Sequence, residues 1–125
     1  MNDLEILIKQ IKTTPENTEF KGVIEIIDKY YRYTPTRFVN GTDSENIINP
    51  AGENEGSCKI FSFAQLLQLD ERQTLHCFGK YYREDVLKKP EGTDHANIRT
   101  FIKYGWQQIR FDNTALEPDN STTMD

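Results

Sequence analysis

The sequence has no long apolar run and few of the residues on which most enzyme and metal chemistry depends. Its 125 residues include only two cysteines, two histidines and one tryptophan. No stretch approaches the roughly 20 apolar residues that a membrane-crossing helix needs. The N-terminus also lacks the basic-then-apolar pattern of a secretory signal. We therefore expect synthesis in the cytoplasm and no membrane partner.

The scarcity of cysteine and histidine limits disulfides and metal sites. Two cysteines in a chain without an export signal are expected to be free thiols. Cys58, His76, Cys77 and His95 lack the ligand pairs, two to four residues apart, that structural zinc sites use. The acidic segment 40–55 lacks the EF-hand spacing and its central glycine. The sequence therefore predicts no metal site and no cofactor.

The net charge of −5 is unevenly distributed along the chain. Four acids and no base fall in residues 112–125, so residues 1–111 carry a net charge of only −1. Residues 79–110 hold seven bases against four acids. Such a bipolar surface can orient a partner electrostatically. It lacks the clustered basic face and high isoelectric point of a nucleic-acid-binding domain, so no nucleic-acid partner is expected.

Apolar residues recur at helical spacing in five segments, which predicts an all-α fold: a single compact bundle of about five helices. The expected helices cover about residues 4–12, 15–33, 57–69, 70–89 and 94–104. Ser57, Asp70 and Asp94 are the expected N-caps of the last three, and Gln73 completes a capping box with Asp70. Gly105 is placed for the left-handed turn that ends the fifth helix. Residues 109–111 are expected to form one short extended segment.

Two segments lack helical periodicity. Residues 37–56 are rich in Asn, Asp, Gly, Glu and Pro, and we expect one long loop there. Long ordered loops in compact domains are often functional. Residues 113–125 are acidic and polar, and are expected to form a disordered tail. The predicted organisation is therefore a helical domain at 1–112 followed by a flexible acidic tail at 113–125.

Short polar and aromatic motifs occur in a fixed order between Phe20 and Leu116. They are Tyr33-Thr34-Pro35-Thr36-Arg37-Phe38, Asn40-Gly41, Gly56-Ser57-Cys58-Lys59-Ile60-Phe61, Thr74-Leu75, Phe78-Gly79-Lys80-Tyr81-Tyr82-Arg83, Asp94-His95-Ala96-Asn97-Ile98-Arg99 and Gly105-Trp106. In these motifs the chain resembles the HopJ type III effector family. The resemblance implies a bacterial virulence protein that type III secretion delivers into a host cell. It implies no reaction, cofactor or catalytic residue.

The N-terminus suggests an alternative to delivery. Residues 1–12 are predicted to form an amphipathic helix, whereas effector N-termini are typically polar and unfolded. A structural housekeeping role in the bacterial cytoplasm is therefore the alternative to injection.

Cys58 is the clearest candidate for covalent chemistry. With Ser57 as the helix cap, Cys58 would lie in the first helical turn beside Lys59. A helix N-terminus and a nearby cation lower the pKa of a thiol and make it nucleophilic. The other reading is that Cys58 is a small buried packing residue. A Cys–His–Asp arrangement would add His95 or His76 as the base and Asp94 or Asp70 as the residue that orients it.

Five polar or aromatic side chains are candidates for ligand binding: Lys59, Tyr82, Arg83, Asn97 and Arg99. The two guanidinium groups suit a carboxylate or a phosphate. The alternative is that Arg83 and Arg99 pair with the acids of the 37–56 loop and hold it on the body.

The sequence thus predicts a non-enzymatic domain that binds a protein or a small polar ligand. The binding groove would lie between the 40–56 loop, the start of the third helix and the start of the fifth. If the protein is secreted, its partner would be a host protein. The alternative function is a cysteine-dependent hydrolase or transferase that uses Cys58 with His95 or His76.

Overall fold

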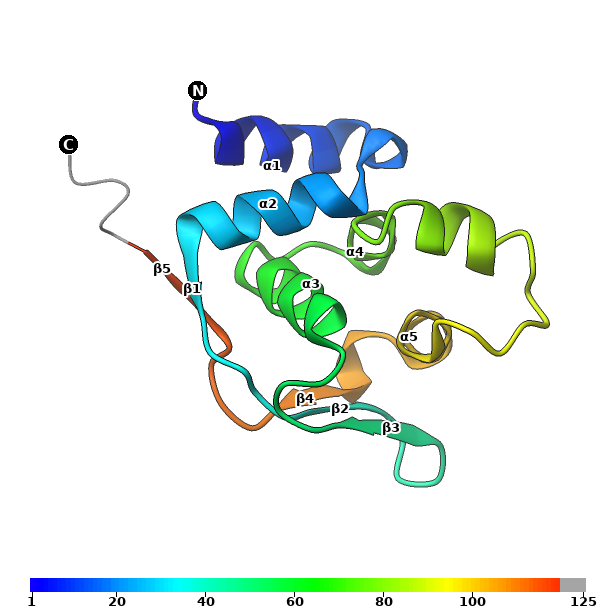
Figure 1. Ribbon diagram of the computed structural model, residues 1–125. Helices are drawn as coiled ribbons and strands as arrows, with labels where there is room; N and C mark the ends of the chain where they lie inside the picture. The colour runs from blue at the N-terminus through cyan, green and yellow to red at the C-terminus, as the bar shows by residue number, and fades with distance from the viewer. Residues whose placement is uncertain (120–125) are drawn as a thin grey trace.

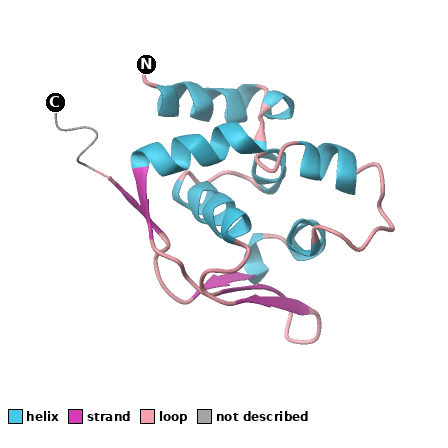
Figure 2. Cartoon of the chain, in the orientation of Figure 1, coloured by secondary structure: helices cyan, strands magenta, loops and turns pink. Residues whose placement is uncertain are grey.

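A computed structural model describes residues 1–119, and it contains strands as well as helices (Figures 1 and 2). The helices are α1 (Asp3–Thr13), α2 (Phe20–Tyr30), α3 (Glu55–Leu66), α4 (Glu71–His76), α5 (Ala96–Tyr104), the π-helix η2 (Tyr81–Val86) and the 3₁₀ turns η1 (Pro15–Asn17) and η3 (Trp106–Gln108). The strands are β1 (Tyr31–Tyr33), β2 (Phe38–Gly41), β3 (Asn46–Asn49), β4 (Ile109–Phe111) and β5 (Leu116–Pro118). The prediction of an all-α bundle is therefore wrong.

The strands form two small antiparallel sheets. One has the order β3-β2-β4, and β1 pairs with β5 in the other. The expected long loop at 37–56 is thus largely the β2–β3 hairpin. Its strands were missed because two of its buried positions hold Asn40 and Asn49, where a half-buried strand usually has apolar residues. The extended segment expected at 109–111 is confirmed as β4.

Helix α3 is the centre of the core, as its nearly all-apolar surface predicts. It lies between the α1–α2 pair and the three-stranded sheet (Figure 1). Phe61 contacts the rings of Phe38, Phe78, Phe101 and Trp106. Within residues 1–119, no helix is both long and apolar enough to cross a membrane.

The start of α3 differs from the prediction in a way that affects the site. The helix begins at Glu55, and its N-cap is Asn54, with a left-handed backbone (φ 51°), rather than Ser57. Helix α5 begins at Ala96 after His95, which is also left-handed (φ 52°), so Asp94 is not the N-cap. Asparagine and histidine are among the non-glycine residues that most often adopt this conformation. The capping box of Asp70 and Gln73 is confirmed.

Two glycines shape the chain around the later helices. Gly79 has φ +61° and separates α4 from η2, and a Cβ there would lie 2.8 Å from the backbone nitrogen of Phe20. Only glycine fits such a close approach, which brings the start of α2 against η2. Gly105 has φ +71° and ends α5 as predicted. Trp106 then packs on Phe101 and donates its indole N–H to the carbonyl of Leu69.

The segment after Asn113 is not a tail from its beginning. Leu116 and Ala115 are buried, and the carbonyl of Ala115 accepts a hydrogen bond from the backbone of Thr34. Strand β5 pairs with β1 immediately afterwards. The tail expected from residue 113 is therefore wrong for residues 115–118, and residues 120–125 of that expectation lie outside the described residues.

Leu116→Ala should destabilise the fold by about 2–5 kcal/mol, because it removes a fully buried leucine side chain from the core. The exposed Leu87 provides a matched control, and Leu87→Ala should change the free energy of unfolding by less than about 0.5 kcal/mol. Urea unfolding followed by circular dichroism measures both. Equal stability of the two variants would show that the C-terminal strand does not contribute to the core.

Candidate functional site

A cavity of about 420 Å³ opens where β3, the start of α3 and the start of α5 meet. Ile47 lines it from β3, Asn54 and Ser57 from the start of α3, and His95 and Asn97 from the start of α5. Phe20, Phe78 and Tyr81 also line the cavity, and these three rings make up its aromatic wall. The cavity thus forms among the three segments that the sequence suggested for a groove.

Four asparagines hold these segments together. Asn40 donates to the backbone and side-chain oxygens of Asn97, at 2.8 and 3.0 Å. Asn97 and Asn49 exchange a reciprocal pair of amide hydrogen bonds, at 2.8 and 3.2 Å. Asn54 donates to the Asn49 Oδ1 at 2.7 Å. This amide network (Asn40, Asn49, Asn54 and Asn97) joins the β2–β3 hairpin to the first turns of α3 and α5.

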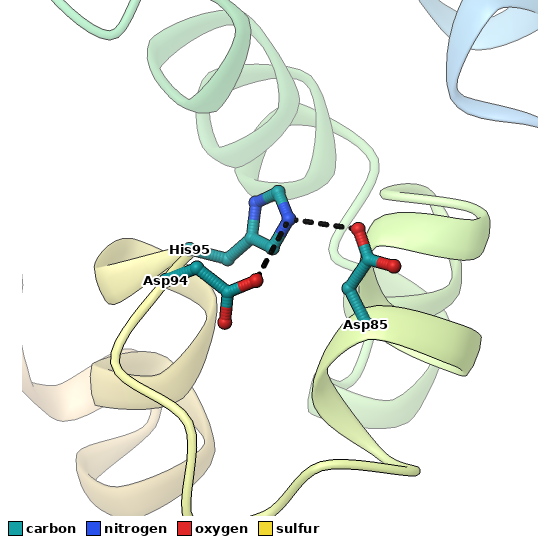
Figure 3. A group of neighbouring side chains, drawn as sticks. All are labelled: Asp85, Asp94 and His95. Carbon is teal, nitrogen blue, oxygen red and sulfur yellow. Dashed lines mark hydrogen bonds and ion pairs between the residues drawn. The ribbon is translucent and has the colours of Figure 1, made fainter.

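The His95 ring lies between two carboxylates (Figure 3). Its Nε2 is 2.9 Å from the Asp85 Oδ2 and 3.8 Å from the Asp94 Oδ2. Asp85 comes from η2, whereas Asp94 and His95 directly precede α5. The imidazole ring also packs against the ring of Tyr81, with ring centroids 5.0 Å apart. We call Asp85, Asp94 and His95 the histidine–aspartate cluster.

Arg99 fixes both carboxylate-bearing segments of this cluster. Its Nη2 lies 2.6 Å from the Asp94 Oδ1, and its Nε donates to the Asp94 carbonyl at 2.6 Å. The same guanidinium donates to the carbonyls of Lys89 and Asp85. The hydrogen bond from Arg99 lowers the pKa of Asp94 below its ordinary value, so this carboxylate stays ionised. Arg99 therefore positions the 85–94 segment and does not pair with the acids of the 37–56 loop.

The thiol of Cys58 lies apart from this cluster. Cys58 is 1% exposed, and its Sγ donates to the carbonyl of Thr36 at 3.6 Å. Burial raises the pKa of this thiol above its ordinary value. Lys59, expected to activate it, instead pairs with Asp28 at 2.9 Å. No hydrogen bond joins Cys58 to either histidine within residues 1–119, so the structure does not assemble the proposed Cys58, His95 and Asp94 triad.

The remaining candidate ligand-binding residues have structural contacts elsewhere. Arg83 donates to the carbonyls of Thr18 and His76 and to the Nδ1 of His76. Burial, with the nearby Arg83 charge, lowers the pKa of His76, which therefore stays neutral. Tyr82 packs edge-on against His76, with ring centroids 5.2 Å apart. Of the five predicted ligand-binding residues, only Asn97 lines the cavity, while Lys59 lies over the ring of Tyr33.

Sequence reasoning missed several residues that shape the site. Asp85 and Tyr81 are four positions apart, a spacing that places two residues on one helical face, and both contact His95. This spacing in the sequence could have predicted that Tyr81 and Asp85 face the same neighbour. The contributions of Phe20 and Asn54 had no local signal, because they depend on contacts between distant segments. Among the loop acids, Glu45 pairs with Lys103 at 2.8 Å, a pairing that was not predicted.

The sequence profile of the HopJ type III effector proteins matches residues 4–116. The chain belongs to this family. Among solved structures, it is similar to the "unknown function protein VPA0580", with a TM-score of 0.88, 44% sequence identity and 95% of each chain covered. A comparison with curated proteins gives no significant match. The resemblance to the HopJ family that the sequence motifs indicated is thus confirmed. The family description names a type III effector and gives no biochemical activity.

Removing one member of the amide network of this HopJ protein should destabilise it strongly. Asn97→Ala removes the side-chain hydrogen bonds that Asn97 makes with Asn40 and Asn49 in a buried site, while the bond from Asn40 to the backbone carbonyl of residue 97 remains. Because each weakened or lost buried hydrogen bond costs about 1–3 kcal/mol, we expect a loss of about 1–3 kcal/mol in the free energy of unfolding, measured by urea unfolding. The matched control is Asn113→Ala, an exposed position where less than about 0.5 kcal/mol is expected. A loss at Asn97 no larger than the control's would contradict a structural role for the network.

The native thiols should react slowly. Burial raises the pKa of Cys58 and raises that of Cys77 to about 12, so little thiolate is present at pH 7.5. Intact-mass analysis after iodoacetamide treatment should show no adduct on the time scale that alkylates free glutathione. In guanidinium chloride it should show two adducts. Rapid single alkylation of native Cys58 below neutral pH would instead support the nucleophile hypothesis.

Proposed function

We propose that this domain binds a small polar ligand with a planar ring in the cavity between β3, α3 and α5. The single observation that carries the proposal is the composition of the cavity. Its lining combines amide and hydroxyl groups with aromatic rings, in a volume of about 420 Å³. Binding sites for small molecules typically combine an apolar lining with a few placed polar groups in volumes of this order.

The aromatic wall suits a flat ligand. Phe20 contacts Tyr81 edge-on at 5.2 Å between ring centroids, and Tyr81 in turn packs on His95. Rings held by one another in this way offer a face to a planar group at little cost in side-chain entropy. A ligand ring would therefore be bound by stacking and by burial of its apolar surface.

The polar side of the cavity supplies hydrogen-bonding groups that internal contacts do not use. Asn54 donates through its Nδ2, and its Oδ1 has no partner within the described chain. The hydroxyl of Ser57 likewise has no hydrogen-bond partner among residues 1–119. An amide oxygen and a hydroxyl can accept from and donate to the polar edge of a ring. These groups favour a neutral polar ligand over a multiply charged one.

The alternatives receive less support. A cysteine-dependent hydrolase or transferase needs an accessible thiol next to a base, and Cys58 is buried with its Sγ turned to Thr36. A host or bacterial protein partner needs an extended surface, which a cavity of this volume does not provide. We therefore propose a non-enzymatic role in ligand binding, with a small molecule as the partner.

The family description bears on the cellular compartment in which the protein acts. Membership in the type III effector family indicates secretion. Helix α1 has a capping box from Asn2 and Glu5 and buries Leu7 and Ile11 in the core. Export through a narrow secretion channel would require this helix to unfold. We propose that the folded, ligand-binding form acts in the bacterial cytoplasm, or in the host after refolding.

Filling the cavity should abolish ligand binding without unfolding the protein. Ser57→Leu places a larger apolar side chain in the cavity at a half-buried position. A library of planar heterocycles is screened by thermal shift, and hits are confirmed by chemical-shift changes of Ala96 and Asn97. Binders of the wild type should lose at least about tenfold in affinity in this variant, equivalent to about 1.4 kcal/mol.

The matched control is Ser44→Leu in the exposed β2–β3 turn, where binding should be unchanged. Circular dichroism checks that both variants are folded. The absence of any binder, or binders whose affinity is the same in Ser57→Leu and the wild type, would contradict the proposal.

A further inference from the structure

We propose that the histidine–aspartate cluster (Asp85, Asp94 and His95) binds one divalent transition-metal ion. This site is separate from the proposed ligand cavity and does not depend on it, although His95 borders both. The three candidate ligand atoms all lie within 4.8 Å of one another. They are the His95 Nε2 and one carboxylate oxygen from each aspartate.

The spacing of these atoms is close to that of a coordination sphere. Zinc binds imidazole nitrogen and carboxylate oxygen at about 2.0–2.2 Å, which places neighbouring ligands about 3 Å apart. The Nε2 is 2.9 Å from the Asp85 Oδ2 and 3.8 Å from the Asp94 Oδ2. All three atoms lie within 4.8 Å of one another, so the Asp94 carboxylate has to move toward the other two ligands for them to share one ion. The side chains already converge on one point (Figure 3).

The carboxylates are held in place by the rest of the fold. Arg99 binds the Asp94 Oδ1 and leaves the Oδ2 directed toward His95. It also donates to the carbonyl of Asp85, which links η2 to the segment before α5. A hydrogen bond to the second oxygen of a ligating carboxylate is a common means of orienting metal ligands. Gly92 permits this arrangement, because a Cβ there would lie 2.5 Å from the Arg99 Nη2.

The donor set indicates the kind of ion. One nitrogen and two oxygens suit a first-row transition ion such as Zn²⁺, Co²⁺ or Mn²⁺. Calcium takes six to eight oxygen ligands, and magnesium prefers an all-oxygen octahedron. Three protein ligands leave at least one position for water. Two carboxylates against one guanidinium also leave a net negative charge for a cation. In the metal-bound state the Nε2 carries no proton, so the ring proton resides on Nδ1.

The test uses the full chain without a histidine tag, titrated with ZnCl₂ by calorimetry and with CoCl₂ by visible absorption. We expect saturable binding of one ion per chain. Asp85→Asn and His95→Asn should each weaken binding by at least about tenfold, the scale of loss seen even for residues that only orient ligands. Asparagine tolerates the left-handed backbone at position 95, and Asp85 has no other side-chain partner among residues 1–119. Both variants should therefore fold.

The matched control is Asp43→Asn, an exposed carboxylate of the acidic loop, and it should leave zinc affinity unchanged. Zinc should also raise the Tm of the wild type and of Asp43→Asn but not of Asp85→Asn, because an ion that binds the folded state stabilises it. The proposal is overturned if no saturable binding occurs, or if Asp85→Asn and His95→Asn retain wild-type affinity. It is equally overturned if calcium binds as tightly as zinc and Asp43→Asn removes that binding.

Discussion

The packing of the β2–β3 hairpin against α3 and α5 depends on buried amide hydrogen bonds. Burying an amide without a partner costs several kcal/mol, so the three buried asparagines of the amide network (Asn40, Asn49 and Asn97) are stable in the interior only when their amides are paired. Asn40 and Asn49 come from adjacent strands, Asn97 from the start of α5 and Asn54 from the start of α3. Their pairing fixes where the two helix starts lie relative to the sheet. The cavity is the space left between segments held in this way.

The helices could be predicted because their signals are local. Apolar spacing, the Asp70–Gln73 capping box and the position of Gly105 each act within a few residues, and the structure confirms them. The two sheets could not, because their strands are three or four residues long and pair across the chain. Strand β2 shows no alternation of buried and exposed positions, because Phe38, Asn40 and Gly41 are buried and Val39 is half-buried. A polar residue that is buried for its hydrogen bonds is indistinguishable in sequence from one that faces solvent.

The candidate site, like the fold, could be predicted only where the sequence signals are local. The sequence indicated which three segments should meet, and the cavity forms among them. It did not indicate which side chains face one another. Arg83 was a candidate for binding a ligand, yet it binds the carbonyl of Thr18, 65 positions away. Asp85, which was not a candidate, contacts His95. Which of these side chains faces His95 depends on how η2 packs against the start of α2, where Gly79 and Phe20 approach closely.

His95 connects the two proposed binding sites through one ring. Its left-handed backbone places the imidazole at the edge of the cavity, against Tyr81 and between two carboxylates. The two ring nitrogens are not equivalent, because the bond made by one fixes the protonation of the other. An ion on Nε2 leaves the proton on Nδ1, which has no partner among residues 1–119 and is then a hydrogen-bond donor. The hydrogen bond to Asp85 instead leaves the proton on Nε2 and makes the Nδ1 of the neutral ring an acceptor. Occupancy of the cluster therefore determines whether the ring offers a donor or an acceptor at its second nitrogen.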